Sequence, residues 1–128
     1  MTTIPTAEVQ RPLNALPFWL SLGMVPLAVW GALAGGWAVC LLPLYSWGMF
    51  SLLDALTGLN EDNADLTTPD SALFWYRLIT LIWVPMQLLL LFWLIWYVPD
   101  APHLGHLETI VLFFGMGVVS GTIGINYA

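Results

Sequence analysis

Two histidines and a glutamate stand close together in the segment HLGHLE, at His103, His106 and Glu108. Imidazole and carboxylate groups at this spacing resemble a metal clip. However, the segment lies between a Pro-Asp-Ala-Pro break at 99–102 and a new apolar run, which is typical of a short polar connection. We therefore favour a connection over a metal site, and the role of the two histidines stays open.

Asp54 is the carboxylate for which a function is easiest to imagine. It ends a long apolar stretch, where an ionisable side chain is costly and is by default a functional hypothesis. Ser46 and Phe50 precede it at i−8 and i−4, so the three share one helical face about 12 Å long. A linear substrate could lie along this face, and the three residues are substrate-tunnel candidates. Packing against another helix explains the same pattern, and Asp54 could equally bond to a neighbour at the water boundary.

Three further polar features have plainer explanations. Arg77 follows Trp75-Tyr76, so its long side chain can reach lipid headgroups from an apolar helix. Gln87 lies deep in an apolar run, where a hydrogen bond to another helix is favoured over catalysis. The acidic segment 58–72 lacks the residue pattern of a calcium loop and is predicted to be a solvated connection.

The composition decides which elements position these groups. Hydrophobic residues make up 59% of the 128 residues, charged residues 8%, and the mean hydropathy is +0.84. Soluble domains carry about 25% charged residues, so this chain cannot cover a surface that faces water. The net charge of −6, with two cations, argues against nucleic acid and against a basic helix lying on anionic lipid. The single cysteine, Cys40, excludes a disulfide framework and cysteine-based metal sites.

The apolar runs predict an all-α, polytopic membrane bundle of four transmembrane helices. No charge occurs between Arg11 and Asp54, a stretch long enough for two helices of about 20 residues each. Membrane strands would alternate apolar and polar residues, whereas these runs are apolar on every face. A cytoplasmic lead-in at 1–16 then precedes a membrane domain at 17–128, with helices predicted over 17–35, 37–57, 73–98 and 107–127.

Arg11 and Arg77 set the predicted orientation. In a bundle of antiparallel neighbours both arginines lie on one side, which the positive-inside rule makes cytoplasmic. Both termini are then cytoplasmic, and the bundle is expected in the inner (cytoplasmic) membrane. A cleaved signal peptide is the alternative for the first helix, because Ala32-Leu33-Ala34 resembles a cleavage site. The long polar lead-in argues against cleavage.

The fourth apolar run contains small residues at helical spacing. Gly117 and Gly121 are separated by three residues, as are Ser120 and Gly124. Such pairs let membrane helices approach closely. They indicate packing rather than catalysis, and they predict a central place for the fourth helix.

Four segments, in order and spacing, resemble a known family. They are LLDALTGLNEDN (52–63), FWYRLIT (74–80), VPMQ (84–87) and GVVSGTIGINYA (117–128). They are similar to the N-terminal part of the bacterial membrane alkane 1-monooxygenases (alkane hydroxylases), of the membrane fatty-acid desaturase/hydroxylase superfamily. The resemblance runs from about residue 40 to the end. Family members continue into His-Glu-Leu-x-x-His, so we expect a truncated or split product that ends before this first histidine box.

The resemblance implies a specific chemistry. The family holds two non-haem irons with histidines on the cytoplasmic side. It inserts one oxygen atom of O2 into the terminal methyl group of an n-alkane, using electrons from rubredoxin. An alkane is soluble in the lipid bilayer, so its tunnel should open within the membrane. Without the histidine boxes, residues 1–128 alone are expected to bind no iron and to have no turnover.

Carried over residue by residue, the resemblance implies structural roles and no metal ligands. Ser46 falls where the second helix should line the tunnel, and its small side chain would leave room for a longer substrate. His103 and His106 match no family histidine. The positions that match the acidic-Gly-Asn stretch, the aromatic-Arg pair and the residue just before the histidine box are Asp54, Gly58, Asp62, Asn63, Tyr76, Arg77 and Asn126.

Two alternatives stay open. One is a related hydroxylase that acts on the methyl group of an aromatic ring. The other is a non-enzymatic four-helix membrane subunit, which predicts a stable, autonomous bundle. The monooxygenase interpretation predicts instead that the fourth helix exposes a face of small residues that lacks its partners.

Overall fold

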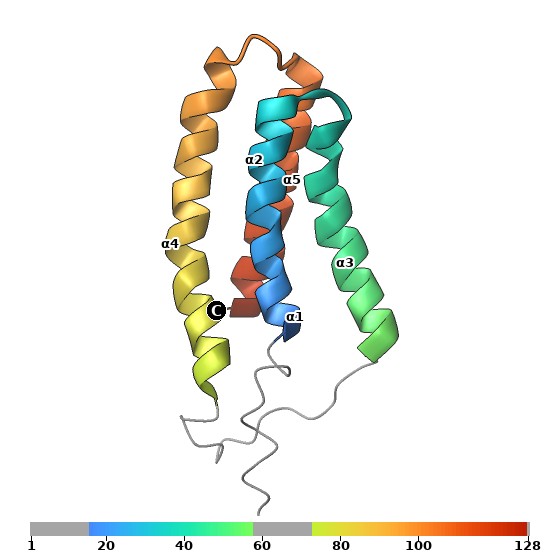
Figure 1. The fold of residues 1–128 in the computed structure, drawn as a ribbon, viewed down its shortest axis with the longest axis vertical. Coiled ribbons are helices and arrows are strands. Elements are labelled where there is room, and N and C mark those ends of the chain that lie inside the picture. Colours follow the sequence, from blue (N-terminus) through green and yellow to red (C-terminus); the bar gives the residue numbers. More distant parts are fainter. Residues whose placement is uncertain (1–15, 58–72, 128) are drawn as a thin grey trace, which may run out of the picture.

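The part of the chain that the structure describes is all-helical and contains no strand. A computed structural model describes residues 16–57 and 73–127, which form four helical segments side by side (Figure 1). The prediction of an all-α fold is therefore confirmed for this part of the chain.

The first segment joins α1 (Leu16–Trp19), the 3-10 helix η2 (Leu20–Gly23) and α2 (Met24–Ala34). The backbone stays right-handed helical across both junctions. The tighter turn of η2 lies just before Pro26, whose ring nitrogen cannot donate to the carbonyl of Leu22. The segment ends at Gly35, where φ is +66° and ψ is −162°, a conformation that only glycine adopts without strain.

The remaining segments are also apolar runs that end at glycine, proline or polar residues. The 3-10 helix η3 (Gly36–Cys40) leads into α3 (Leu41–Thr57), and Pro43 lies in the first turn of α3, where its missing N–H costs no helical bond. After the acidic segment come α4 (Phe74–Tyr97), the 3-10 helix η5 (Val98–Asp100) and α5 (His106–Tyr127). The helices thus lie close to the four predicted ranges, except that residues 36–40 wind as a 3-10 helix.

The four segments run antiparallel to their neighbours in sequence, so the bundle has two distinct ends (Figure 1). At the end that we call the arginine end, α1 and α4 begin and α3 and α5 finish; Arg77 lies there, in the first turn of α4. At the opposite end, the glycine end, lie the Gly35-Gly36 turn and the connection 101–105. Helix α5 packs mainly against α3 and also contacts α2 and α4, so it is central in the bundle.

Apolar side chains at helical spacing form the core between these segments. In α5 the buried residues recur at intervals of four, three and four, which is the spacing of a helix that packs along a seam. In α2 the buried positions include two alanines, so neighbouring helices can come close. The core residues of these two helices are Met24, Ala28, Ala32, Leu112, Met116, Val119 and Ile123.

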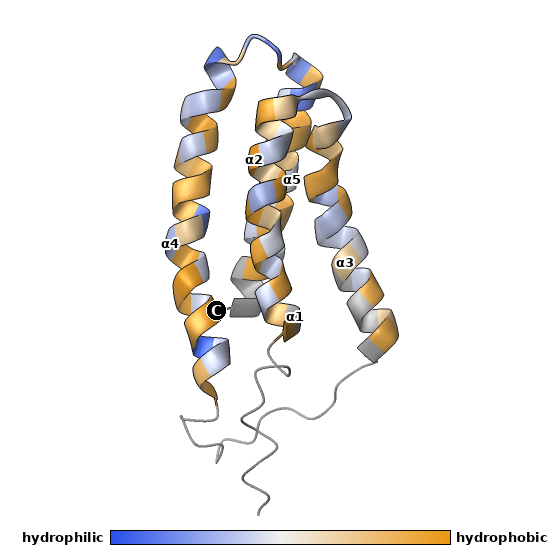
Figure 2. Cartoon of the chain, in the orientation of Figure 1, coloured by the Kyte–Doolittle hydropathy of each residue, from blue (hydrophilic) through white to orange (hydrophobic). Residues whose placement is uncertain are grey.

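Hydrophobic residues occur along all four segments (Figure 2), and many of them lie on the outside of the bundle. Large hydrophobic side chains are exposed on every segment, including Trp30, Leu44, Leu89, Phe92 and Phe114. Soluble monomers rarely expose contiguous apolar surface of this extent. Two helical stretches, Phe74–Asp100 and His106–Ile123, are long and apolar enough to cross a membrane. Within an apolar window of 18 residues in each, only 22% and 28% of the residues are buried.

The close approach of α5 to α3 occurs at Gly115, not at the predicted pair of glycines. A Cβ atom built on Gly115 would lie 3.1 Å from side-chain atoms of both Leu42 and Pro43. Gly117 and Gly121 have no atom of another described segment within 4 Å of that position and are exposed. Among the described residues this pair therefore does not bring helices together, and no other described segment covers its face of α5.

Candidate functional site

An open apolar groove lies along the first half of α4. Its volume is about 650 Å³. The residues that line it recur at intervals of three and four, so they form one face of the helix, about 18 Å long. They are Leu73, Tyr76, Arg77, Thr80, Leu81, Val84 and Pro85.

Polar groups lie at defined depths along this groove. Arg77 lies near one end, and it is exposed. The hydroxyl of Thr80 donates to the carbonyl oxygen of Tyr76 at 3.0 Å, so it is turned toward the backbone. Pro85 has no N–H to donate to the carbonyl of Leu81, which therefore loses its usual helical donor. The groove thus joins a cationic end to a mostly apolar floor.

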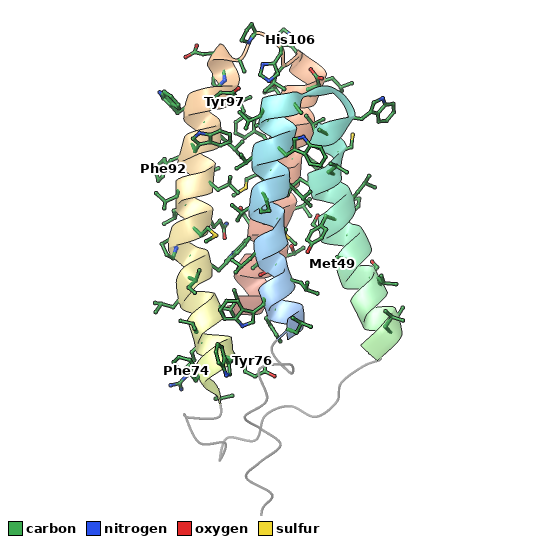
Figure 3. The ribbon with its side chains drawn as sticks, viewed as in Figure 1. Met49, Phe74, Tyr76, Phe92, Tyr97 and His106 are labelled. Carbon is green, nitrogen blue, oxygen red and sulfur yellow. The ribbon has the colours of Figure 1, made fainter. Side chains whose placement is uncertain are left out.

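Aromatic rings surround the arginine end of the groove and connect α4 to α1. The rings of Phe18 and Tyr76 meet edge to face at 5.3 Å between centroids, and those of Trp19 and Trp75 at 6.2 Å. Phe74 and Trp75 make a similar contact at 5.4 Å. Figure 3 shows Phe74 and Tyr76 at the start of α4. Tyr76 and Arg77, predicted as a pair, both line the groove.

At the glycine end, Glu108 joins two segments that are distant in sequence. One carboxylate oxygen accepts a hydrogen bond from the backbone N–H of Gly36, and the other accepts from Gly105. Gly105 directly precedes α5 and Glu108 is its third residue, so the second bond is half of a capping box. The carboxylate therefore fixes the turn between α2 and η3 to the start of α5.

His103 holds the same turn from its other side. Its Nε2 donates to the carbonyl oxygen of Ala32 at 2.9 Å, and its ring lies 6.3 Å from that of Tyr97. The Tyr97 ring in turn stacks on Trp93 with 5.0 Å between centroids. His106 is exposed at the start of α5 (Figure 3). His103 and Glu108 are thus engaged in backbone hydrogen bonds of the turn.

The described residues contain no group of three or more histidine, cysteine or acidic side chains that could hold a metal ion. The histidine-rich ligand set of a di-iron centre is therefore not supplied by residues 16–57 and 73–127, and no catalytic step through iron follows from them.

The predicted tunnel residues are only partly described. Ser46 is buried, and its hydroxyl donates to the carbonyl oxygen of Pro43 at 3.1 Å. It lies one helical turn from Leu42, which belongs to the core, so its position fits the packing alternative. The side chains of Phe50, Asp54 and Asn126 lie outside the described part of the structure, as do all of Gly58, Asp62 and Asn63. Among the predicted site residues, Tyr76 and Arg77 therefore both line the groove. The tunnel role of Ser46 stays a prediction.

Two features of these sites were missed in the sequence. The pattern Gly105-x-x-Glu108 at a helix start is a signal for a capping glutamate, but nothing local points from Glu108 to Gly36. The groove leaves no periodic signal in the sequence, because apolar residues occur on every face of α4. Comparison of the chain with protein-family models, with curated proteins and with solved structures gives no match.

Proposed function

We propose that this chain is an integral membrane bundle of four transmembrane helices that forms the N-terminal membrane part of a non-haem di-iron alkane 1-monooxygenase. The complete enzyme would hydroxylate the terminal methyl group of an n-alkane with O2, and electrons would come from rubredoxin. The proposal combines the resemblance of four sequence segments with the exposed surfaces of the bundle.

The exposed apolar side chains support the membrane part of the proposal. Leu89, Phe92 and Trp96 are between 66% and 73% exposed along one helix, and similar residues are exposed on the other segments. Lipid solvates such side chains, whereas water does not. In hydrocarbon, helices also satisfy their own backbone hydrogen bonds.

The uncovered face of α5 is the observation that carries the oxygenase part. Gly117 and Gly121 are exposed and contact no other described segment, although small residues at this spacing are typical of a helix–helix interface. An autonomous four-helix subunit would be expected to bury such a face. A bundle that packs against further helices of a larger enzyme would leave it open, as it is here.

The position of the end of α5 also agrees with this proposal. Helix α5 finishes toward the arginine end, the end of the bundle at which α4 begins (Figure 1). The family's first histidine box would follow Asn126 and would therefore enter on the side that carries Arg77. The positive-inside rule assigns that side to the cytoplasm, where rubredoxin would deliver electrons.

The coding sequence beyond residue 128 tests the proposal directly. We expect codons for His-Glu-Leu-x-x-His to follow, and the intact product to convert an n-alkane to the 1-alkanol. Oxidation of a methyl-substituted aromatic ring in preference to n-alkanes would favour the related hydroxylase. A stop codon followed by unrelated sequence would favour the non-enzymatic subunit.

Residues 1–128 alone should bind no iron, because the described part holds no ligand group and the resemblance places the histidines further on. Metal analysis of the purified chain after incubation with Fe(II) measures this. Iron retained in a fixed ratio to protein would contradict the assignment of the ligands to histidine boxes outside residues 1–128.

A further inference from the structure

We propose that the groove on α4 binds one anionic glycerophospholipid, with its phosphate on Arg77 and one acyl chain along the groove toward Pro85. This inference rests on the membrane part of the proposed function and is independent of the oxygenase part. It assigns a lipid of defined headgroup charge to one place on the exposed surface of α4.

The charge of the groove favours a phosphate group. Arg77 is the one cationic side chain of Lys or Arg type among residues 16–57 and 73–127. A guanidinium carries five N–H donors in a planar fork and binds phosphate with two parallel hydrogen bonds. Because it has this many donors, Arg77 can bind a phosphate beside another partner. The net charge of −6 repels anionic lipid elsewhere, so binding of such a lipid requires a local cation.

The shape of the groove suits an acyl chain. Its volume of about 650 Å³ falls within the range of about 300–1,000 Å³ that is usual for small-molecule sites. Leu81 and Val84, which line it, are 71% and 55% exposed. An acyl chain bound in the groove would cover these apolar side chains. The lining positions follow the helix axis away from Arg77, which is the direction of a chain whose headgroup lies at the membrane surface.

The aromatic residues place this end of the groove at headgroup depth. Phe74, Trp75 and Tyr76 surround Arg77 in sequence, and Phe18 and Trp19 of α1 contact them. Tryptophan and tyrosine concentrate at the membrane–water interface, where phosphates also lie. The guanidinium and a lipid phosphate would therefore meet at the same depth, and the apolar floor would begin where the acyl chain begins.

Lipid competition on the full chain tests the proposal. The chain is purified in detergent, stripped of lipid and offered an equimolar mixture of phosphatidylglycerol and phosphatidylcholine, and the bound lipids are counted by native mass spectrometry. We expect one phosphatidylglycerol to be retained in preference. In Arg77→Gln the preference should fall about fivefold, the effect expected for one cation near anionic lipid. Arg77→Lys keeps the charge without the planar fork and should give an intermediate preference.

A matched pair of variants tests the acyl-chain part of the groove. Leu81 and Leu89 are both 71% exposed on α4, but only Leu81 is among the lining residues. Leu81→Trp should fill the groove and reduce phosphatidylglycerol retention, while Leu89→Trp should leave it unchanged. Circular dichroism of each variant checks that the helices are retained, and variants that lose helicity are replaced by Val84→Trp, another lining position.

The possible failures are distinguishable. Equal preference in the parent chain and Arg77→Gln, or equal effects of the two tryptophan variants, would overturn the lipid site while leaving the membrane bundle intact. A dimer mass that excludes lipid and disappears in Leu81→Trp would show that a second copy covers the groove, and would also overturn it. Behaviour as a detergent-independent soluble protein would instead remove the membrane premise itself.

Discussion

Glu108 connects parts of the chain that lie far apart in sequence. Its two carboxylate oxygens accept backbone hydrogen bonds from residues 72 and 3 positions away, at Gly36 and Gly105. A carboxylate at a helix N-terminus also interacts favourably with the helix dipole. Together with His103, which donates to Ala32, it fixes the turn between α2 and η3 against α5.

Replacing Glu108 should loosen this turn. Glu108→Ala removes both acceptors, so we expect the melting temperature of the detergent-solubilised chain to fall. Glu108→Gln retains one side-chain carbonyl and should lower it less. The effect of Glu108→Gln is not zero, because hydrogen bonds to a charged carboxylate are stronger than those to a neutral amide. Thermal unfolding followed by circular dichroism measures the melting temperature of both variants.

His106→Gln is the matched control, because His106 is exposed beside the same turn. It should leave the melting temperature unchanged. A different result would favour the metal-clip interpretation over the backbone role. In that result, zinc stabilises the parent chain, and His106→Gln and Glu108→Ala lower the melting temperature equally. Added zinc then restores the melting temperature of neither variant.

At the residue scale, the sequence predicted a backbone turn but not the hydrogen bond that holds it. The Gly35-Gly36 turn was predicted, because paired glycines adopt positive φ angles freely, and both do so here. The partner of the Gly36 N–H could not be predicted, since a contact across 72 residues leaves no periodic trace in a single sequence.

At the element scale, α5 has two faces with different roles. One face carries Leu112, Met116, Val119 and the close contact at Gly115. The other carries Gly117 and Gly121, which are exposed. The spacing of the glycines predicts helix packing, but it could not identify Gly115 as the glycine that meets another helix within this bundle. That choice depends on the rotation of α5 about its axis, which its neighbours set.

The two faces predict opposite responses to the same substitution. Gly115→Leu should lower the free energy of unfolding by about 1–3 kcal/mol, because the new side chain meets Leu42 and Pro43. Gly117→Leu should be tolerated, since nothing lies within 4 Å of its Cβ position among the described residues. Unfolding of both variants in mixed detergent micelles gives the comparison. Equal destabilisation would mean that α5 is rotated from its described position.

The groove on α4 was also beyond prediction from the pattern of residues. Helix α4 is apolar on every face, so periodicity cannot separate a face that packs from one that lines a groove. The aromatic-arginine pair at residues 76 and 77 was identified, and its position in the groove comes from the structure alone.

At the scale of the whole molecule, polar residues gather at the glycine end, and large hydrophobic side chains are exposed along the helices (Figure 2). We expect the expressed chain to stay in the membrane fraction after an alkaline carbonate wash and to be extracted only by detergent. Ultracentrifugation of washed membranes followed by immunoblotting measures this. A compact monomer in a detergent-free supernatant would contradict the bilayer as solvent.

The all-helical fold was predictable because few alternatives exist for long apolar runs in lipid. The breaks at Gly35-Gly36 and at 99–102 were predictable because glycine and proline act locally. The number of membrane crossings stays a prediction, since two of the four segments are long and apolar enough by themselves. The enzyme assignment stays a proposal for the coding sequence to decide.

The bond from Gly36 to Glu108 has a consequence for the order of synthesis. When the first hairpin leaves the ribosome, the N–H of Gly36 lacks the acceptor that it has in the complete bundle, because Glu108 lies 72 residues further along and is not yet translated. The turn reaches its final arrangement only after α4 has been made and α5 has begun. The turn between α2 and η3 is therefore held in place only by the start of α5, so its final hydrogen bond forms after most of the polypeptide has been made.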